Sequence, residues 1–163
     1  MVSDDHALCF TGHRPDKLGE EDELRFRLQQ RIVQAISEGY TVFYCGMALG
    51  TDIIAGELVV SLRQQYPELR LIAVIPFPEQ SRGWPQPWRT RWNRLMRRAD
   101  EKMTLYPRFV RGCYHARNRY MVDHAEKVIA VYDGSQEGGT HMTITYARKK
   151  GVPVELIAPQ TPR

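Results

Sequence analysis

The sequence has little cysteine and no long hydrophobic run. Its 163 residues include three Cys, at positions 9, 45 and 113, too few and too scattered for a disulfide framework and without the CxxC spacing of a metal site. Apolar runs such as 71–78 fall far short of the roughly 20 residues that a membrane helix needs. The first six residues are polar and acidic, unlike a cleaved signal peptide. We therefore expect a soluble, cytoplasmic protein with free thiols, no bound metal or cofactor and no membrane contact.

Charge is distributed unevenly along the chain. Hydrophobic residues make up 42% and charged residues 26%, as in an ordinary globular domain. Residues 82–119 carry ten Arg and one Lys against Asp100 and Glu101, a local net charge of +9, whereas the whole chain has +4 and the remainder therefore −5. A mildly acidic body with one arginine-rich segment is unlike a protein that coats nucleic acid through uniform basicity.

Short apolar segments alternate with segments of helical period. We predict strands at 7–10, 41–45, 69–75, 102–106, 127–132 and 154–157, and helices at 21–38, 52–65, 86–99, 114–125 and 140–150. Continuously apolar strands are typical of a parallel sheet covered by helices on both faces. The prediction is one Rossmann-like α/β domain over 1–163, with a mostly parallel sheet, a core at about 7–157 and a frayed tail at 158–163.

Three glycine-containing loops follow the predicted strands at 7–10, 41–45 and 127–132. In such a sheet, ligands bind at the carboxyl ends of the strands, where the strand order reverses. The first loop contains Thr11, Gly12, His13 and Arg14. Its glycine permits a tight turn, and His13 and Arg14 can meet an anion. A plain turn with a solvated Arg14 is the simpler interpretation of this loop taken alone.

The second loop has Gly46 and Gly50 four residues apart, before Thr51 and Asp52. Backbone N–H groups and the positive end of the following helix could face a phosphate here. The loop lacks GxGxxG and the Lys of a P-loop. Alternatively, Thr51 or Asp52 is simply the N-cap of the helix. Asp52 suits a ribose hydroxyl or an amine better than a dianion.

The third loop runs from Asp133 through Glu137 to Gly138, Gly139 and Thr140. Its Gly-Gly-Thr at a helix start again supplies N–H donors and a hydroxyl. Each glycine loop is weak support by itself, but three at one edge of a sheet favour a binding site.

The predicted helix at 114–125 contains two arginines around Asn118. Arg117 or Arg119 could clamp a phosphate in bidentate fashion. Because residues two apart in a helix face different directions, at least one of the two is also interpretable as an exposed charge.

All three tryptophans lie at the start of the arginine-rich segment, at 84, 88 and 92. Trp88, Trp92, Leu95 and Ala99 form a helical stripe suited to packing on the sheet. Basic residues among aromatics could instead bind single-stranded nucleic acid. We favour packing for Trp88 and Trp92, and we leave Trp84, which precedes the helix, as a residue that could stack on a ligand.

Several motifs, in this order and spacing, resemble the SLOG superfamily, and within it the YpsA-like branch. They are TGHRP, GMALGTD, PFPEQ with Trp84 four residues later, RNRYMVDHAEKVIAVYDG, and GGTHMTITYA before Gly151. The resemblance covers about residues 8–157. It implies a modified Rossmann fold and a nucleotide or nucleotide-sugar pocket over 46–52, Arg117, Asn118 and 138–140. It also implies a homodimer, because relatives pair.

The superfamily includes phosphoribohydrolases, the DNA-uptake protein DprA and sensor domains for nucleotide-derived ligands. The enzymes of this superfamily carry a PGGxGTxxE pattern, whose Glu acts with an upstream Arg on the N-glycosidic bond. The resemblance implies that Arg117 could match this Arg. Here His141, Met142 and Thr143 follow the Gly-Thr pair, so the expected carboxylate is missing. Glu137, Asp133 and Asp52 are substitutes in principle.

The glycine loops, the arginines and the resemblance together leave three candidate functions. The first is binding of a nucleotide-derived ligand for sensing or regulation. The second is hydrolysis of an N-glycosidic bond by a relocated carboxylate. The third, ranked last, is DprA-like binding of single-stranded DNA through residues 82–98.

Overall fold

The computed structural model describes residues 6–159. It contains one six-stranded sheet in which every neighbouring pair of strands is parallel. The strands are β1 (His6–Gly12), β2 (Tyr40–Cys45), β3 (Arg70–Ile75), β4 (Glu101–Thr104), β5 (Lys127–Val131) and β6 (Val154–Ile157).

Five α-helices and one short 3-10 helix connect the strands. They are η1 (Pro15–Lys17), α1 (Glu21–Ser37), α2 (Thr51–Leu62), α3 (Gln86–Arg98), α4 (Cys113–Asp123) and α5 (Gly139–Lys149). The predicted Rossmann-like α/β class is confirmed, with an entirely parallel sheet. Of the tail predicted to be frayed, residues 160–163 lie outside the described residues.

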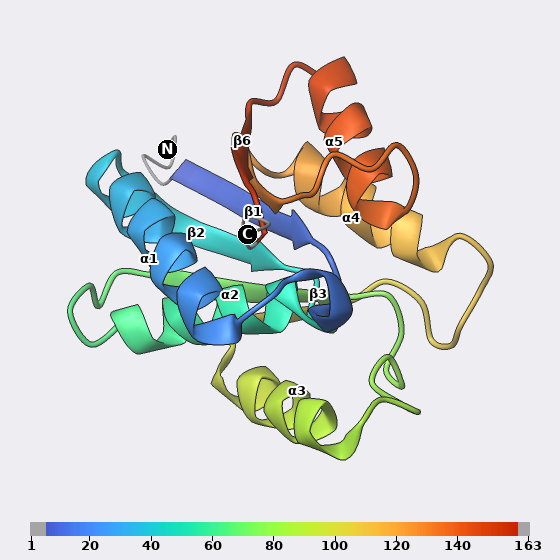
Figure 1. Ribbon diagram of the computed structural model, residues 1–163. Coiled ribbons are helices and arrows are strands. Elements are labelled where there is room, and N and C mark those ends of the chain that lie inside the picture. Colours follow the sequence, from blue (N-terminus) through green and yellow to red (C-terminus); the bar gives the residue numbers. More distant parts are fainter. Residues whose placement is uncertain (1–5, 160–163) are drawn as a thin grey trace, which may run out of the picture.

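The strand order β4-β3-β2-β1-β5-β6 places β1 near the centre of the sheet. The chain builds outward from β1 to β4 and then returns to β5 on the other side of β1, so the strand order reverses between β1 and β5. Helices α1 and α2 cover one face of the sheet and α4 and α5 the other, while α3 packs outside α2 (Figure 1). The reversal sets the carboxyl ends of β1, β2 and β5 side by side.

Alternation along each strand sends side chains into two separate apolar layers. Leu8, Phe10 and Phe43 belong to the layer beneath α1, α2 and α3. Cys9 and Val128 belong to the layer beneath α4 and α5. Because the central strands are buried on both faces, their sequences are continuously apolar, as expected for a covered parallel sheet.

Helix α3 buries its aromatic stripe, as predicted, but against α2 rather than directly on the sheet. Leu95 packs so closely on Gly56 of α2 that a Cβ added there would lie 2.7 Å from a Leu95 methyl carbon. Trp92 is buried, and Trp88 packs partly buried against the same core. The absence of a side chain at Gly56 therefore allows the close approach of α2 and α3.

Arg91 is a structural residue of the arginine-rich segment. Its guanidinium donates to Glu57 Oε1 at 2.6 Å and to Glu21 Oε1 at 2.9 Å, so it ties α3 to α2 and to α1. The same group lies over the Trp88 ring, 4.2 Å from its centroid. The charge of Arg91 is therefore paired within the protein.

No helix among residues 6–159 is long and apolar enough to cross a membrane.

Candidate functional site

A cavity of about 350 Å³ opens at the carboxyl ends of β1, β2 and β5, where the strand order reverses. All three glycine loops contribute to its wall, together with the start of α4 and the segment before α3. Its lining residues are Thr11, Gly12, His13, Arg14, Asp16, Lys17, Ala48, Leu49, Asp52, Gln80, Trp84, Tyr114, Arg117, Asn118, Glu137, Gly138, Gly139 and Thr140. This is the edge at which the sequence predicted a site.

The N-terminus of α5 faces this cavity. The helix begins after Gly138, whose φ of 98° favours glycine, and no side chain of residues 6–159 caps it. Its first intrahelical bond runs from the Met142 N–H to the Gly138 carbonyl. The N–H groups of Gly139 and Thr140, at the cavity wall, precede that bond and belong to the turn that has no intrahelical acceptors. This end of α5 is therefore suited to bind an anion.

Arg117 of α4 places a buried cation in the same wall. Its side chain is 3% exposed, and its guanidinium donates to the Gly46 carbonyl and, through Nε, to Asn118 Oδ1 at 2.8 Å. Burial lowers the pKa of Arg117 because it removes water from the charged form. A Cβ on Gly46 would lie 2.8 Å from the guanidinium carbon. Glycine at position 46 therefore makes room for this cation.

Asp52, in the first turn of α2, is the buried carboxylate of the cavity wall. It is 5% exposed, and its Oδ2 accepts a hydrogen bond from the Ala48 N–H at 3.2 Å. Burial raises its pKa from 3.8 to about 6, although the positive charge of Arg117 and the Ala48 hydrogen bond act in the opposite direction. Near neutral pH, Asp52 is thus a carboxylate that retains a substantial affinity for a proton.

The N-cap of α2 is Gly50, so the alternative that Thr51 or Asp52 caps the helix is wrong. Gly50 has a φ of 98°, a conformation that glycine adopts without strain. Thr51 instead donates its hydroxyl to the His13 carbonyl at 3.0 Å, and its N–H bonds the same oxygen. These bonds join the first glycine loop to the second and leave this helix end less open than that of α5.

Gln80 is a cavity residue that belongs to the PFPEQ motif but was not predicted as part of the site. Its side-chain NH₂ donates to the Gly46 carbonyl at 3.0 Å, and its Oε1 accepts the Trp92 indole N–H at 3.1 Å. Gln80 and Arg117 therefore share one carbonyl oxygen. Gln80 stands among the polar residues Glu79, Ser81 and Arg82, so its sequence position carries no signal and only the fold shows its partners.

His13 and Asp133 form a pair where β1 and β5 end. His13 Nε2 lies 2.9 Å from Asp133 Oδ1 and 3.1 Å from the Asp133 backbone N. The two contacts are alternatives, because Nε2 donates to the carboxylate only when protonated and accepts the N–H only when not. Hydrogen bonds from Ser135 hold the pKa of Asp133 below its usual range, with His13 a smaller cause. His13 lines the cavity, but Asp133 does not.

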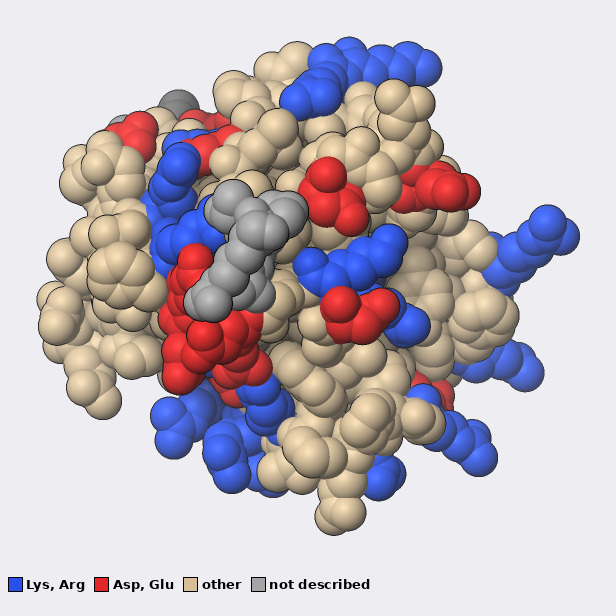
Figure 2. Space-filling model, in the orientation of Figure 1, with Lys and Arg blue, Asp and Glu red and all other residues tan. Residues whose placement is uncertain are grey.

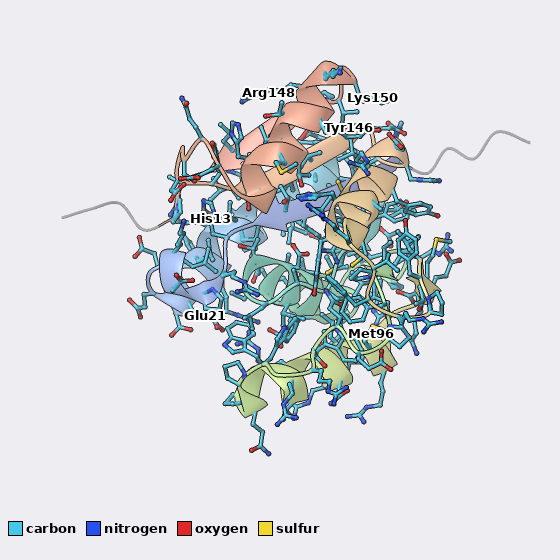
Figure 3. The ribbon with its side chains drawn as sticks, turned by 90° about the vertical axis from the view of Figure 1, so that its right-hand side faces the viewer. His13, Glu21, Met96, Tyr146, Arg148 and Lys150 are labelled. Carbon is cyan, nitrogen blue, oxygen red and sulfur yellow. The ribbon has the colours of Figure 1, made fainter. Side chains whose placement is uncertain are left out.

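The rim of the cavity carries both rings and charges. Trp84 is half-buried, Tyr114 is 40% exposed, and the guanidinium carbon of Arg117 lies 5.8 Å from the Tyr114 ring centroid. Arg14 and Lys17 add exposed positive charge to the rim. In Figure 3, His13 marks the β1 side of this region, above the start of α1 at Glu21. Aromatic rings and basic side chains thus lie at the opening, together with the carboxylates of Asp16 and Glu137.

Residues 8–161 match the sequence profile described as the YspA SLOG family. The chain is a member of this SLOG family. Among its relatives, the UPF0398 protein YpsA of Bacillus subtilis (strain 168) is 24% identical over 164 residues, which cover 93% of this chain and 91% of that one. The SPbeta prophage-derived protein YoqJ of the same strain is 31% identical over 140 residues, which cover 76% of this chain and 81% of that one.

Among solved structures, DNA processing protein A from Helicobacter pylori matches this SLOG chain with a TM-score of 0.65 at 20% identity. The match covers 96% of this chain and 66% of that one, so the chain spans slightly less than two thirds of that protein. That structure was described for its mode of binding single-stranded DNA. At this level of identity, the likeness shows the shared fold.

The SLOG fold brings most of the predicted site residues to the cavity. Four of the predicted residues do not line it. Three of them, Gly46, Gly50 and Thr51, lie behind the lining residues. Gly46 packs against Arg117, and Thr51 bonds the His13 carbonyl. Asp133 lies beyond the wall, paired with His13. Of the two candidate arginines, Arg117 lines the cavity, whereas Arg119 lines a second groove between α4 and α5.

The cavity wall combines hydrogen-bond donors that can bind an anion with the buried carboxylate of Asp52. The free end of α5 and Arg117 can bind a phosphate, and Asp52 can accept a hydrogen bond from a hydroxyl. Asp16 and Glu137 are two exposed carboxylates at the rim. Among residues 6–159, no group of three or more His, Cys, Asp or Glu side chains is arranged to hold a metal ion.

Proposed function

We propose that this SLOG protein binds a nucleotide or nucleotide-derived ligand, containing phosphate and ribose, in the cavity at the carboxyl edge of the sheet. The observation that carries the proposal is that an uncapped helix N-terminus and a buried arginine line one cavity. The biological role that follows is sensing or regulation by the bound ligand.

The phosphate is assigned to the N-terminus of α5. The Gly139 and Thr140 N–H groups and the Thr140 hydroxyl supply donors there. Arg117 is held by the Gly46 carbonyl and by Asn118, so its charge is fixed in place before the ligand arrives. A preorganised cation loses little side-chain freedom on binding, which favours affinity.

The ribose and base are assigned to the other side of the cavity. Asp52 accepts hydrogen bonds, and its negative charge disfavours a second phosphate beside it. Trp84 offers a large, half-buried indole on which a base can stack. This division of the wall fits a phosphorylated nucleoside better than a free phosphate.

Calorimetric titration with 5′-AMP, GMP, CMP and UMP tests the proposal. We expect binding by the unaltered protein, and Thr140→Val and Arg117→Ala should each weaken it about 10-fold or more, because each removes donors to the phosphate. Arg148→Ala is the matched control, since Arg148 lies on α5 outside the cavity lining (Figure 3). Thermal unfolding of each variant separates loss of binding from loss of fold. Absence of binding by all four nucleotides, and by NAD and the dinucleotide pApA as nucleotide-derived ligands, would refute the proposal.

A second candidate function is hydrolysis of an N-glycosidic bond in a nucleoside monophosphate or an NAD-like substrate. Asp52 favours it, because a cavity carboxyl with a pKa of about 6 can exchange a proton near neutral pH. Glu137 and Asp16 are the other carboxylates at the cavity, whereas Asp133 is set apart by its pairing with His13. Incubation with nucleoside monophosphates and NAD, followed by chromatography for free base, tests this function. Base release lost in Asp52→Asn or Glu137→Gln would favour the enzyme.

Single-stranded DNA binding is supported by exposed arginines of the segment 82–98. Arg82, Arg89, Arg94, Arg97 and Arg98 are exposed, while Arg91 is bound by Glu21 and Glu57. Figure 2 shows basic side chains projecting at the lower edge, where Figure 1 has α3. This function predicts DNA affinity that falls steeply with salt, and less steeply in an Arg94→Ala, Arg97→Ala variant.

The homodimer stays a prediction, which light scattering can test.

A further inference from the structure

We infer that the groove between α4 and α5 is a second subsite of the same ligand, one that takes an additional nucleoside–phosphate unit. The inference rests on the proposed function and concerns the length of the ligand. The groove has a volume of about 350 Å³ and is lined by His115, Asn118, Arg119, His141, Met142, Thr143, Thr145, Tyr146 and Lys149.

Asn118 joins the two sites. It lines the cavity on one side and the groove on the other, and its Oδ1 accepts the Nε–H of Arg117. The first turn of α5 is shared in the same way, because Thr140 lines the cavity and His141 lines the groove. A ligand whose phosphate lies at the start of α5 therefore has the groove as its neighbouring space.

The charge of the groove fits an anionic occupant. Arg119 and Lys149 are exposed on opposite walls, the first from α4 and the second from α5. None of the described lining residues is acidic. A second phosphate placed between these two cations would gain Coulomb attraction from both walls.

The groove also offers surface for a ring. Met142 is 48% exposed at its lip, and the Tyr146 ring lies partly buried in its wall. Tyr146 is fixed by a hydrogen bond from its hydroxyl to Asp123 Oδ1 at 2.7 Å, and His141 by the Tyr132 hydroxyl, 3.0 Å from its Nδ1. Two anchored rings and a flexible thioether are suited to pack against a planar base.

The shared chemistry is thus a ligand with two nucleoside–phosphate units, linked either by a pyrophosphate or by a phosphodiester. NAD represents the first linkage and the dinucleotide pApA the second, with 5′-AMP as the one-unit reference. We expect at least one of the two longer probes to bind about 10-fold more tightly than 5′-AMP, equivalent to about 1.4 kcal/mol. The probe that does so identifies the linkage.

The decisive variant is Arg119→Ala, Lys149→Ala. It should remove the advantage of the longer probe and leave the affinity for 5′-AMP within about twofold, because both residues lie outside the cavity. Arg97→Ala, Arg148→Ala is the control with the same change in net charge; Arg97 and Arg148 are both exposed and line neither site. The control should keep the preference for the longer probe.

The outcomes separate this inference from the proposed function. If 5′-AMP binds and neither longer probe binds more tightly, the groove is not a subsite and the proposed function stands. Equal weakening of 5′-AMP and of the longer probe by Arg119→Ala, Lys149→Ala would also overturn the inference. If none of the three probes binds, the proposed function itself fails.

Discussion

Asp52→Asn should stabilise the folded protein at neutral pH. The variant keeps the shape of the side chain and an oxygen for the Ala48 N–H, and it removes a buried negative charge. The pKa of Asp52 rises from 3.8 to about 6 on folding. At about 1.4 kcal/mol per pKa unit, this shift makes the ionised carboxylate cost about 3 kcal/mol of stability, an upper value for the gain in the variant.

The sign of the pH dependence follows from the raised pKa. Between pH 4 and 6 the folded protein holds the proton of Asp52 and the unfolded chain does not, so the stability from this group falls as the pH rises. The advantage of Asp52→Asn should therefore be largest above pH 7 and vanish near pH 4. Below that pH, the carboxyl is protonated in both states.

Urea denaturation of the two proteins from pH 4 to pH 8 measures this difference. Asp133→Asn is the control whose difference from the unaltered protein should stay constant over this range, because the pKa of Asp133 is lowered in the fold and its stabilisation is lost only as the pH falls below about 4. If Asp52→Asn is less stable than the unaltered protein at pH 7.5, or equally different at all pH values, Asp52 is an ionised partner of Arg117 and burial does not control its protonation.

Three further predictions concern residues that hold the fold or the cavity wall in place. Gln80→Ala should cost roughly 1–3 kcal/mol in urea denaturation, because the buried Trp92 indole N–H loses its acceptor; an unchanged midpoint would contradict this. Arg91→Ala should lower the midpoint of thermal unfolding clearly more than Arg94→Ala, since Arg91 joins three helices and Arg94 is exposed; equal effects would refute the structural role. Gly46→Ala should weaken 5′-AMP binding about 10-fold, measured by calorimetry, by displacing the guanidinium; unaltered affinity would show that its position is unimportant.

Most of the fold was predictable because local patterns and topology agree. Helix α1 was expected at 21–38 and is observed at Glu21–Ser37, since Leu24 and Leu28 repeat at the helical period and are buried. Strand β4 was less well placed, expected at 102–106 and observed at Glu101–Thr104, because all four of its residues are exposed and give no apolar pattern. Edge strands carry the weakest signal for this reason.

The site was predictable at the level of loops and not at the level of contacts. Glycines after apolar strands indicated the edge at which the cavity lies, because parallel strands end at the same edge of a sheet. Which arginine lines the cavity depended on the orientation of α4, which no spacing of Arg117 and Arg119 specifies. The pairing of His13 with Asp133, 120 residues apart, likewise required the neighbouring placement of β1 and β5.

Local periodicity and motif order were enough to predict the layers of the molecule, the edge of the sheet at which the cavity lies and the family to which the chain belongs. The contacts of the charged side chains, in contrast, could be read only from the folded chain. In the fold, Arg91 bonds α1 and α2, Arg117 is buried in the wall that contains Asp52, and Arg119 lines a separate groove. The physical reason is that the role of a charge depends on its distance to other charges and to water, and the fold fixes both.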